Sequence, residues 1–130
     1  MLVVDASLVV NAVLIGSGLR ELGDDELVAP PLLWPETRSS LHQIAWRGDL
    51  PRKVVERART DLASMPVTAR DPDRLADVAW DVADELGWAK TYDAEYIALA
   101  RILGCRLVTA DARLRRGADR LGFVVGPTEL

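Results

Sequence analysis

The sequence is poor in the residues that form disulfides, bind zinc or cross membranes. Among its 130 residues it has one cysteine, Cys105, and one histidine, His42. A single cysteine cannot form an internal disulfide bond, and this isolated pair does not provide the ligand set of a zinc site. No apolar run approaches the roughly 20 residues needed to cross a bilayer, and no basic segment precedes an apolar stretch at the N-terminus. We therefore expect a cytoplasmic protein that makes no membrane contact.

Lysine is also scarce, and basic residues are outnumbered by acidic ones. Of the 16 basic residues, only Lys53 and Lys90 are lysines, against 20 acidic residues and a net charge of −4. Proteins that coat nucleic acid through bulk electrostatics need many phosphate contacts, so this composition argues against that class. The arginine fork suits phosphate or carboxylate groups, although a GC-rich coding bias would produce the same excess of arginine. Any contact with nucleic acid must be local.

What the chain does have is the composition of an ordinary folded domain. Hydrophobic residues make up 49% of it and charged residues 28%, which is unlike the composition of disordered chains. A chain of this length buries roughly two thirds of the surface that it exposes when unfolded. No linker, low-complexity segment or internal repeat divides it. We expect a single domain that spans residues 1–130.

Apolar strand patterns alternate with helical patterns along the whole chain. The pattern predicts strands at residues 2–5, 27–29, 66–69, 106–109 and 123–125, and helices at residues 6–15, 33–46, 51–62, 71–86, 92–103 and 111–121. Right-handed crossovers through helices are the usual way to join neighbouring parallel strands. The sequence therefore predicts an α/β fold with a central parallel sheet flanked by helices.

Acidic residues recur where these strands end or helices begin. Asp5 ends the first strand, Asp111 lies two residues beyond Thr109 of the fourth, and Glu36 and Asp93 lie in first helical turns. Ligands of open parallel sheets bind beyond the carboxyl ends of the strands. Taken singly, the aspartates are explained equally well as helix caps or as partners of the helix dipole. Glu36 fits that explanation less well, because it interrupts a run of apolar residues that we expect in the core.

The local sequences around these acids narrow the choice. Asp5 lies in Val-Val-Asp-Ala-Ser, Glu36 in Trp-Pro-Glu-Thr-Arg, Asp93 in Tyr-Asp-Ala-Glu-Tyr-Ile-Ala-Leu-Ala and Asp111 in Leu-Val-Thr-Ala-Asp-Ala-Arg-Leu. Together these segments resemble the PIN-domain ribonucleases, and specifically the VapC toxins of bacterial toxin–antitoxin pairs. The most specific part is the Tyr-Asp-Ala block followed, after a strand, by Thr-Ala-Asp. The resemblance covers the chain from Leu2 to about Val125.

The resemblance implies a PIN-like fold and a metal-dependent endoribonuclease that leaves 5′-phosphate and 3′-hydroxyl ends. It also implies a cognate antitoxin that blocks the metal site, and a homodimer. The family often carries a further acid where this chain has Leu114, so a second metal ion is not assigned. The family's metal-binding acids correspond to Asp5, Glu36, Asp93 and Asp111, and its active-site hydroxyls to Ser7 and Thr109.

Carboxylates that converge repel one another, and that repulsion raises their pKa values unless a cation neutralises them. Oxygen ligands without His or Cys suit Mg²⁺ or Mn²⁺. Such an ion can polarise a phosphate and activate a water molecule, so that no protein nucleophile is needed. Phosphate contacts are predicted, as a group, at four nearby cations, although a solvated helix face explains each of them singly: Arg38, Arg113, Arg115 and Arg116.

Two other functions fit parts of the pattern. A Mg²⁺-dependent phosphotransfer enzyme could use an aspartate after its first strand, but it usually carries a second acid two residues later, where this chain has Ser7. A non-catalytic PIN-like module could keep the fold and use it only to bind a protein partner. The loss of any of the four acids would favour that module, and none is lost.

Overall fold

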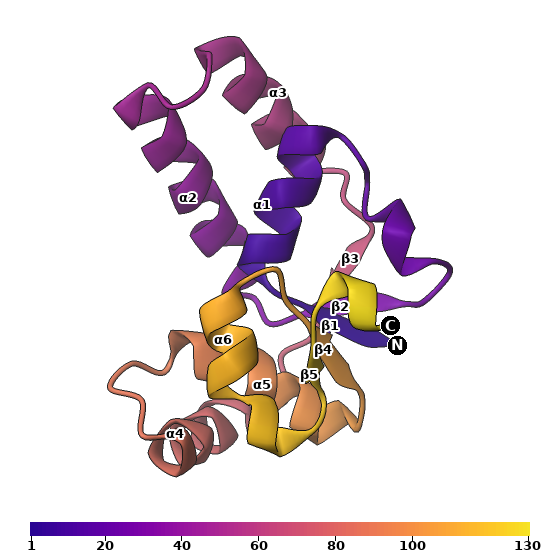
Figure 1. The fold of residues 1–130 in the computed structure, drawn as a ribbon, viewed down its shortest axis with the longest axis vertical. Coiled ribbons are helices and arrows are strands. Elements are labelled where there is room, and N and C mark those ends of the chain that lie inside the picture. The colour runs from indigo at the N-terminus through magenta and orange to yellow at the C-terminus, as the bar shows by residue number, and fades with distance from the viewer.

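Five short parallel strands form the central sheet of the protein (Figure 1). The structure is a computed structural model that describes residues 1–130. The strand order is β3-β2-β1-β4-β5, and every neighbouring pair is parallel. The strands are β1 (Leu2–Val4), β2 (Leu27–Ala29), β3 (Val67–Ala69), β4 (Arg106–Val108) and β5 (Val124–Val125).

Six α-helices connect and flank these strands. In Figure 1, α1 to α3 lie together at the top, and α4 to α6 lie together at the bottom. No helix is long and apolar enough to cross a membrane. The helices are α1 (Ala6–Ile15), α2 (Leu33–Arg47), α3 (Arg52–Leu62), α4 (Leu75–Leu86), α5 (Tyr92–Leu103) and α6 (Ala112–Gly117). The predicted α/β fold, with a parallel sheet flanked by helices, is confirmed.

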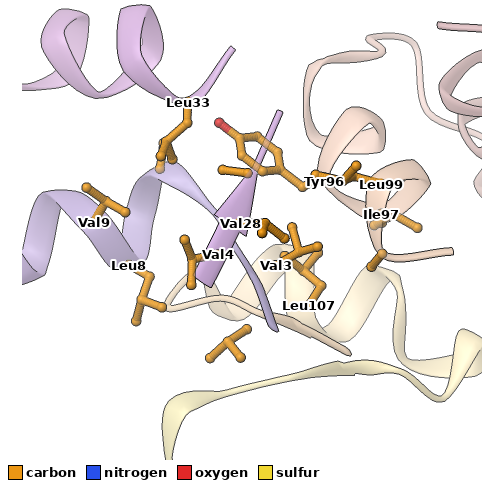
Figure 2. Packing of buried hydrophobic residues seen from close by; sticks show 14 of the residues in the cluster. Val3, Val4, Leu8, Val9, Val28, Leu33, Tyr96, Ile97, Leu99 and Leu107 are labelled. Atoms are coloured by element: carbon orange, nitrogen blue, oxygen red, sulfur yellow. The ribbon is translucent and has the colours of Figure 1, made fainter. Parts of the chain in front are cut away.

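Helix α5 lies at the centre of the hydrophobic core. It packs on β1 and β4 and against α4, and all its residues from Tyr96 to Ala100 are fully buried. Figure 2 shows Tyr96, Ile97 and Leu99 of this helix beside Val3 and Leu107 of the strands. Burial on several sides explains why the Tyr-Ile-Ala-Leu-Ala segment is almost continuously apolar. The core therefore fixes the first turn of α5, which carries Asp93.

Two predicted helices have different bounds in the structure. The fourth was expected to begin at residue 71, but α4 begins at Leu75, after a turn in which the Leu75 N–H donates to the Pro72 carbonyl. The last was expected to reach Leu121, but α6 ends at Gly117, and a separate 3₁₀ turn covers Asp119–Leu121. Glycine is a poor helix former, by about 1 kcal/mol relative to alanine, so Gly117 is a natural end point.

The connections of β1 place a crevice at the carboxyl edge of the sheet. The chain passes from β1 to β2 on one side, whereas β4 lies on the other side of β1. A change of direction of this kind opens a crevice beyond the carboxyl ends of the two central strands, where α/β proteins bind ligands. Val4 pairs with Val108, so Asp5 and Thr109 leave the sheet side by side.

Candidate active site at the carboxyl edge of the sheet

Asp5 is the buried centre of the candidate site. Its carboxylate accepts hydrogen bonds from Ser7 Oγ at 2.8 Å and from the Leu8 N–H at 3.0 Å, and Thr109 Oγ1 donates to its Oδ2. The side chain caps α1, so Asp5 does serve as a helix cap, as its position in the sequence suggested. Burial raises the pKa of Asp5 to about 6 even though these donors favour the charged form. A helix cap alone does not require that degree of burial.

The hydroxyls of Ser7 and Thr109 tie the first and fourth strands together beyond the sheet. Their oxygens lie 3.3 Å apart. The Ala110 N–H donates to Ser7 Oγ at 3.1 Å, and the Asp111 N–H donates to Thr109 Oγ1 at 3.0 Å. The two hydroxyls thus orient Asp5 and also fix the loop that carries Asp111.

Asp111 caps α6 and still faces the crevice. Its Oδ1 accepts from the backbone N–H groups of Arg113, at 2.8 Å, and Leu114, at 3.3 Å, while Oδ2 accepts no hydrogen bond from the protein. Asp93 lies opposite, exposed in the first turn of α5. Burial raises the pKa of Asp93, and the charge of Asp111 raises it further, whereas Arg113 opposes the shift. Asp93 and Asp111 are therefore electrostatic neighbours.

Glu36 joins the site from α2. Burial raises its pKa to about 7, and the charges of Asp93 and Asp5 contribute to the shift. Tyr96 donates a hydrogen bond from its hydroxyl to Glu36 Oε1 at 3.3 Å. Figure 2 shows the Tyr96 ring beside the strands, with its hydroxyl pointing towards the α2 end that carries Leu33. The buried tyrosine therefore positions a carboxylate on a different helix.

Three of the four predicted acids share one open cleft of about 650 Å³, which also has Trp88, Lys90, Tyr92 and Arg113 in its wall. The three are Glu36, Asp93 and Asp111. Asp5 does not line this cleft, but its charge interacts with those of Asp93 and Glu36. None of the four acids forms a salt bridge. Segments far apart in the sequence therefore bring uncompensated negative charge to one place.

The donor chemistry of the site fits a hard divalent cation. No three of the Asp, Glu, His and Cys side chains are positioned to hold one metal ion together. Mg²⁺ needs no such cage, because it keeps several waters and is usually bound by one or two carboxylates together with substrate phosphates. The raised pKa values of Asp5, Glu36 and Asp93 show acids that a cation would stabilise.

The four arginines predicted to contact the substrate occupy different surroundings. Arg113 lines the acidic cleft, and Arg38 lines a separate hollow between α2 and α3. Arg116 is exposed on α6. Arg115 instead binds Glu129 through Nε and Nη2, at 2.8 and 2.9 Å, and also binds Asp119. Only Arg113 stands among the acids.

Sequence reasoning missed three aromatic residues of the site: Trp88, Tyr92 and Tyr96. Tyr96 looks like a core residue, and the only sign of its role is its position three residues after Asp93, on the same helix face. Trp88 and Tyr92 belong to the wall of the cleft. The sequence offered one signal for these two residues. They lie in the loop that follows Gly87 and at the start of the helix that carries Asp93.

Comparisons with known proteins agree with one another. The PIN domain model matches residues 2–120. Ribonuclease VapC9 of Mycobacterium tuberculosis and a VapC ribonuclease of Mycobacterium bovis are each 36% identical over 115 residues, which is 88% of this chain and 88% of theirs. The crystal structure of PAE2754 from Pyrobaculum aerophilum superposes with a TM-score of 0.76 at 23% identity, covering 98% of this chain and 91% of that one.

Proposed function

Because this chain belongs to the PIN-domain family, and within it to the VapC ribonucleases, we propose that it is a metal-dependent endoribonuclease that acts as a toxin. The observation that carries the proposal is the meeting of four unpaired carboxylates at the crevice between β1 and β4. Asp5 and Asp93 are the principal metal ligands, and Glu36 and Asp111 are additional or water-mediated ligands. The ion is Mg²⁺ or Mn²⁺.

The chain's own residues organise the reaction around the scissile phosphate. Ser7, Thr109 and the Leu8 N–H hold Asp5 in one orientation, and Tyr96 holds Glu36. When bound, a divalent cation polarises the phosphate and lowers the pKa of a water molecule. Arg113, in the wall of the cleft, offers a phosphate contact next to the acids. No side chain has to act as a covalent nucleophile.

Replacing Asp93 by asparagine tests the proposed site. The variant keeps the shape of the side chain, and Asp93 is exposed, so the fold should remain intact. We expect Asp93→Asn to abolish Mn²⁺ binding in calorimetric titrations and the cleavage of RNA. Asp81→Asn, on the exposed side of α4, is the matched control and should behave like the wild type. Unchanged Mn²⁺ affinity in Asp93→Asn would remove this residue from the ligand set.

Mapping new RNA 5′ ends in cells that express the wild type or Asp93→Asn identifies the substrate and separates the nuclease from a non-catalytic binding module. A nuclease produces new ends only with the wild type. A PIN-like module that merely binds a partner produces the same ends with both proteins. The same expression tests toxicity, because a toxin inhibits growth unless its antitoxin is present.

The hollow between α2 and α3 supports the proposal of an antitoxin partner. It has a volume of about 390 Å³, and Leu41, Ala45, Trp46 and Val55 supply its apolar wall. Trp46 is 81% exposed and lies beside these apolar side chains in the wall of the hollow, so its indole is free to pack against a partner. We place a segment of the antitoxin here. Trp46→Ala should weaken neutralisation by the co-expressed antitoxin without changing cleavage by the isolated toxin.

A homodimer is the assembly proposed for the isolated protein. Light scattering of the purified chain measures its mass directly. A mass close to twice 14.3 kDa supports the dimer, and a mass of one chain at micromolar concentration contradicts it.

A further inference from the structure

Tyr92 is exposed in an unusual place. It is the first residue of α5, directly before Asp93, and 59% of its surface is accessible. The other large apolar side chains with high exposure are Met1, Ile15, Trp46, Trp80 and Leu130. None of those lines the acidic cleft, whereas Tyr92 does. Single exposed aromatics are common on protein surfaces, so the position of Tyr92 beside the acids is what requires an explanation.

The loop before Tyr92 is held firmly in place. It starts at Gly87, whose positive φ of 71° ends α4, and it passes beside α6 (Figure 1). The indole of Trp88 packs on Gly117 of α6 so closely that a Cβ atom there would lie 3.3 Å from Cζ2. Trp88 therefore anchors this connection to α6. Tyr92 lies at the junction of this anchored loop and the buried helix α5.

The cleft wall around Tyr92 combines aromatic and cationic groups. Lys90 and Arg113 are exposed and line the same cleft as Trp88 and Tyr92. An aromatic face with cations beside it matches one repeating unit of a nucleic acid, in which a flat base is attached to a phosphodiester. The cations suit the phosphate, and the exposed ring suits the base.

We propose that Tyr92 is the stacking platform for an unpaired nucleobase next to the scissile phosphate of the RNA. The inference rests on the proposed nuclease function, because that function places a phosphate beside Asp93. A base within a duplex has both of its faces covered by its neighbours and cannot stack on the ring.

The excess of negative charge supports a contribution from stacking to RNA binding. The chain carries a net charge of −4, and Lys90 and Arg113 are the only cations in the wall of the cleft. Electrostatic attraction to the RNA backbone is therefore weak, and the acids oppose it. One base stacked on an aromatic side chain improves binding roughly tenfold, independent of sequence. Tyr92 thus supplies affinity that this surface cannot obtain from charge.

Cleavage kinetics of a 20-nucleotide single-stranded RNA, which spans a site that the wild type cuts, test the inference. Tyr92→Ala should raise KM for this RNA about tenfold with kcat changed by less than threefold, whereas Tyr92→Phe keeps the ring and should match the wild type. Trp80→Ala removes an exposed aromatic outside the cleft and should leave both constants unchanged.

A second measurement detects the stack itself. The same RNA carries 2-aminopurine next to the cut site, and its fluorescence is quenched when the base stacks on an aromatic ring. Quenching by the wild type and by Tyr92→Phe, but not by Tyr92→Ala, supports the platform. An unchanged KM in Tyr92→Ala, or equal quenching by Tyr92→Ala and the wild type, overturns the inference while the nuclease function stands. Absence of any RNA cleavage by the wild type overturns the proposed function, and this inference with it.

Discussion

The carboxylates at the two ends of α6 differ in whether a cation of the protein neutralises them. At its start, Asp111 belongs to a group of four carboxylates that form no salt bridge. We call Asp5, Glu36, Asp93 and Asp111 the cluster. At its end, Arg115 binds both Glu129 and Asp119, and we call these three residues the Arg115 clamp. In the cluster, burial raises the pKa values of Glu36 to about 7 and of Asp5 to about 6. In the clamp, the hydrogen bonds from Arg115 lower the pKa of Glu129 to about 2.

This difference separates a structural use of carboxylates from a functional one. The clamp neutralises its acids with a cation of the same chain, so it has no need of a cation from solution. The cluster holds its acids close together without a salt bridge and buries Asp5 among them, which opposes folding. An arrangement that opposes folding and is nevertheless built from separate segments is typical of binding and catalytic sites. The comparison therefore supports our proposal that a metal ion binds at the cluster and not at the clamp.

The largest expected effect comes from making the same substitution in both regions. Glu36→Gln removes a carboxylate from the cluster, and Glu129→Gln removes one from the clamp. Substitution of residues that support metal ligands reduces activity ~10- to 100-fold, so Glu36→Gln should lose at least that much RNA cleavage. Glu129→Gln should keep cleavage within about twofold, because the clamp acts on stability. Turnover of one RNA oligonucleotide by the two variants measures this, and equal losses would erase the distinction.

The two regions should also respond oppositely to pH. A carboxyl group with a raised pKa stabilises the fold below its unfolded pKa and loses that contribution as the pH rises through the folded value. Because of Asp5 and Glu36, the free energy of unfolding of the metal-free protein should decrease as the pH rises from about 4 to about 7. For the buried Asp5, the rise in pKa from 3.8 to about 6 corresponds to about 3 kcal/mol of folding stability. Glu36 is only half-buried, so screening by solvent makes its contribution smaller than its raised pKa implies. Glu129, with its lowered pKa, loses its contribution only as the pH falls from about 4.5 towards 2.

Melting temperatures with and without metal check this pH dependence. In EDTA, the melting temperature should fall between pH 5 and pH 8. Mn²⁺ should raise it, and more at pH 8 than at pH 5, because the cation stabilises the charged carboxylates. Glu129→Gln should leave the Mn²⁺ effect unchanged. A Mn²⁺ effect that is independent of pH would argue against the cluster as the binding site.

A smaller effect is expected from the hydroxyl that orients Glu36. Tyr96→Phe removes only the donor to Glu36 Oε1 and should weaken Mn²⁺ binding up to about tenfold, since a net hydrogen bond contributes ~0.5–1.5 kcal/mol. Tyr92→Phe removes the same atom from an exposed ring and serves as the control, with Mn²⁺ affinity equal to the wild type. If calorimetry gives equal affinities for the two variants, Tyr96 is a packing residue only.

The sequence predicted most of the fold because the local signals were strong. The alternation of short apolar strands and amphipathic helices, together with glycines at helix ends, located every strand and the helices from α1 to α5 with small errors at their ends. The strand order was not predictable, because it depends on contacts between segments far apart in the chain. The end of α6 was missed because Leu114 and Leu121 fit a helical period, which hid the interruption at Gly117 and Ala118.

The site was predictable in its acids and not in its surroundings. Asp5, Glu36, Asp93 and Asp111 were named from local motifs, and the structure places them in electrostatic contact. Their roles as metal ligands stay predictions. The hydrogen bond from Tyr96 to Glu36 joins residues 60 positions apart, and no local pattern encodes such a contact. The partners of Arg115 were hidden for the same reason, since Glu129 lies in a C-terminal 3₁₀ turn that was not predicted.

The smallest expected effect tests whether Arg115 contacts RNA, as its position in Arg-Leu-Arg-Arg suggested. Arg113→Gln should raise KM for RNA roughly threefold to fivefold, in line with the ~0.2–1 kcal/mol of exposed ion pairs, since Arg113 lines the cleft. Arg115→Gln should leave KM unchanged and lower the melting temperature, because its guanidinium is already engaged by Glu129 and Asp119. If Arg115→Gln raises KM as much as Arg113→Gln does, the clamp must open to let Arg115 reach the RNA. Both ends of α6 would then bind RNA, and the distinction between a structural and a functional end would be lost.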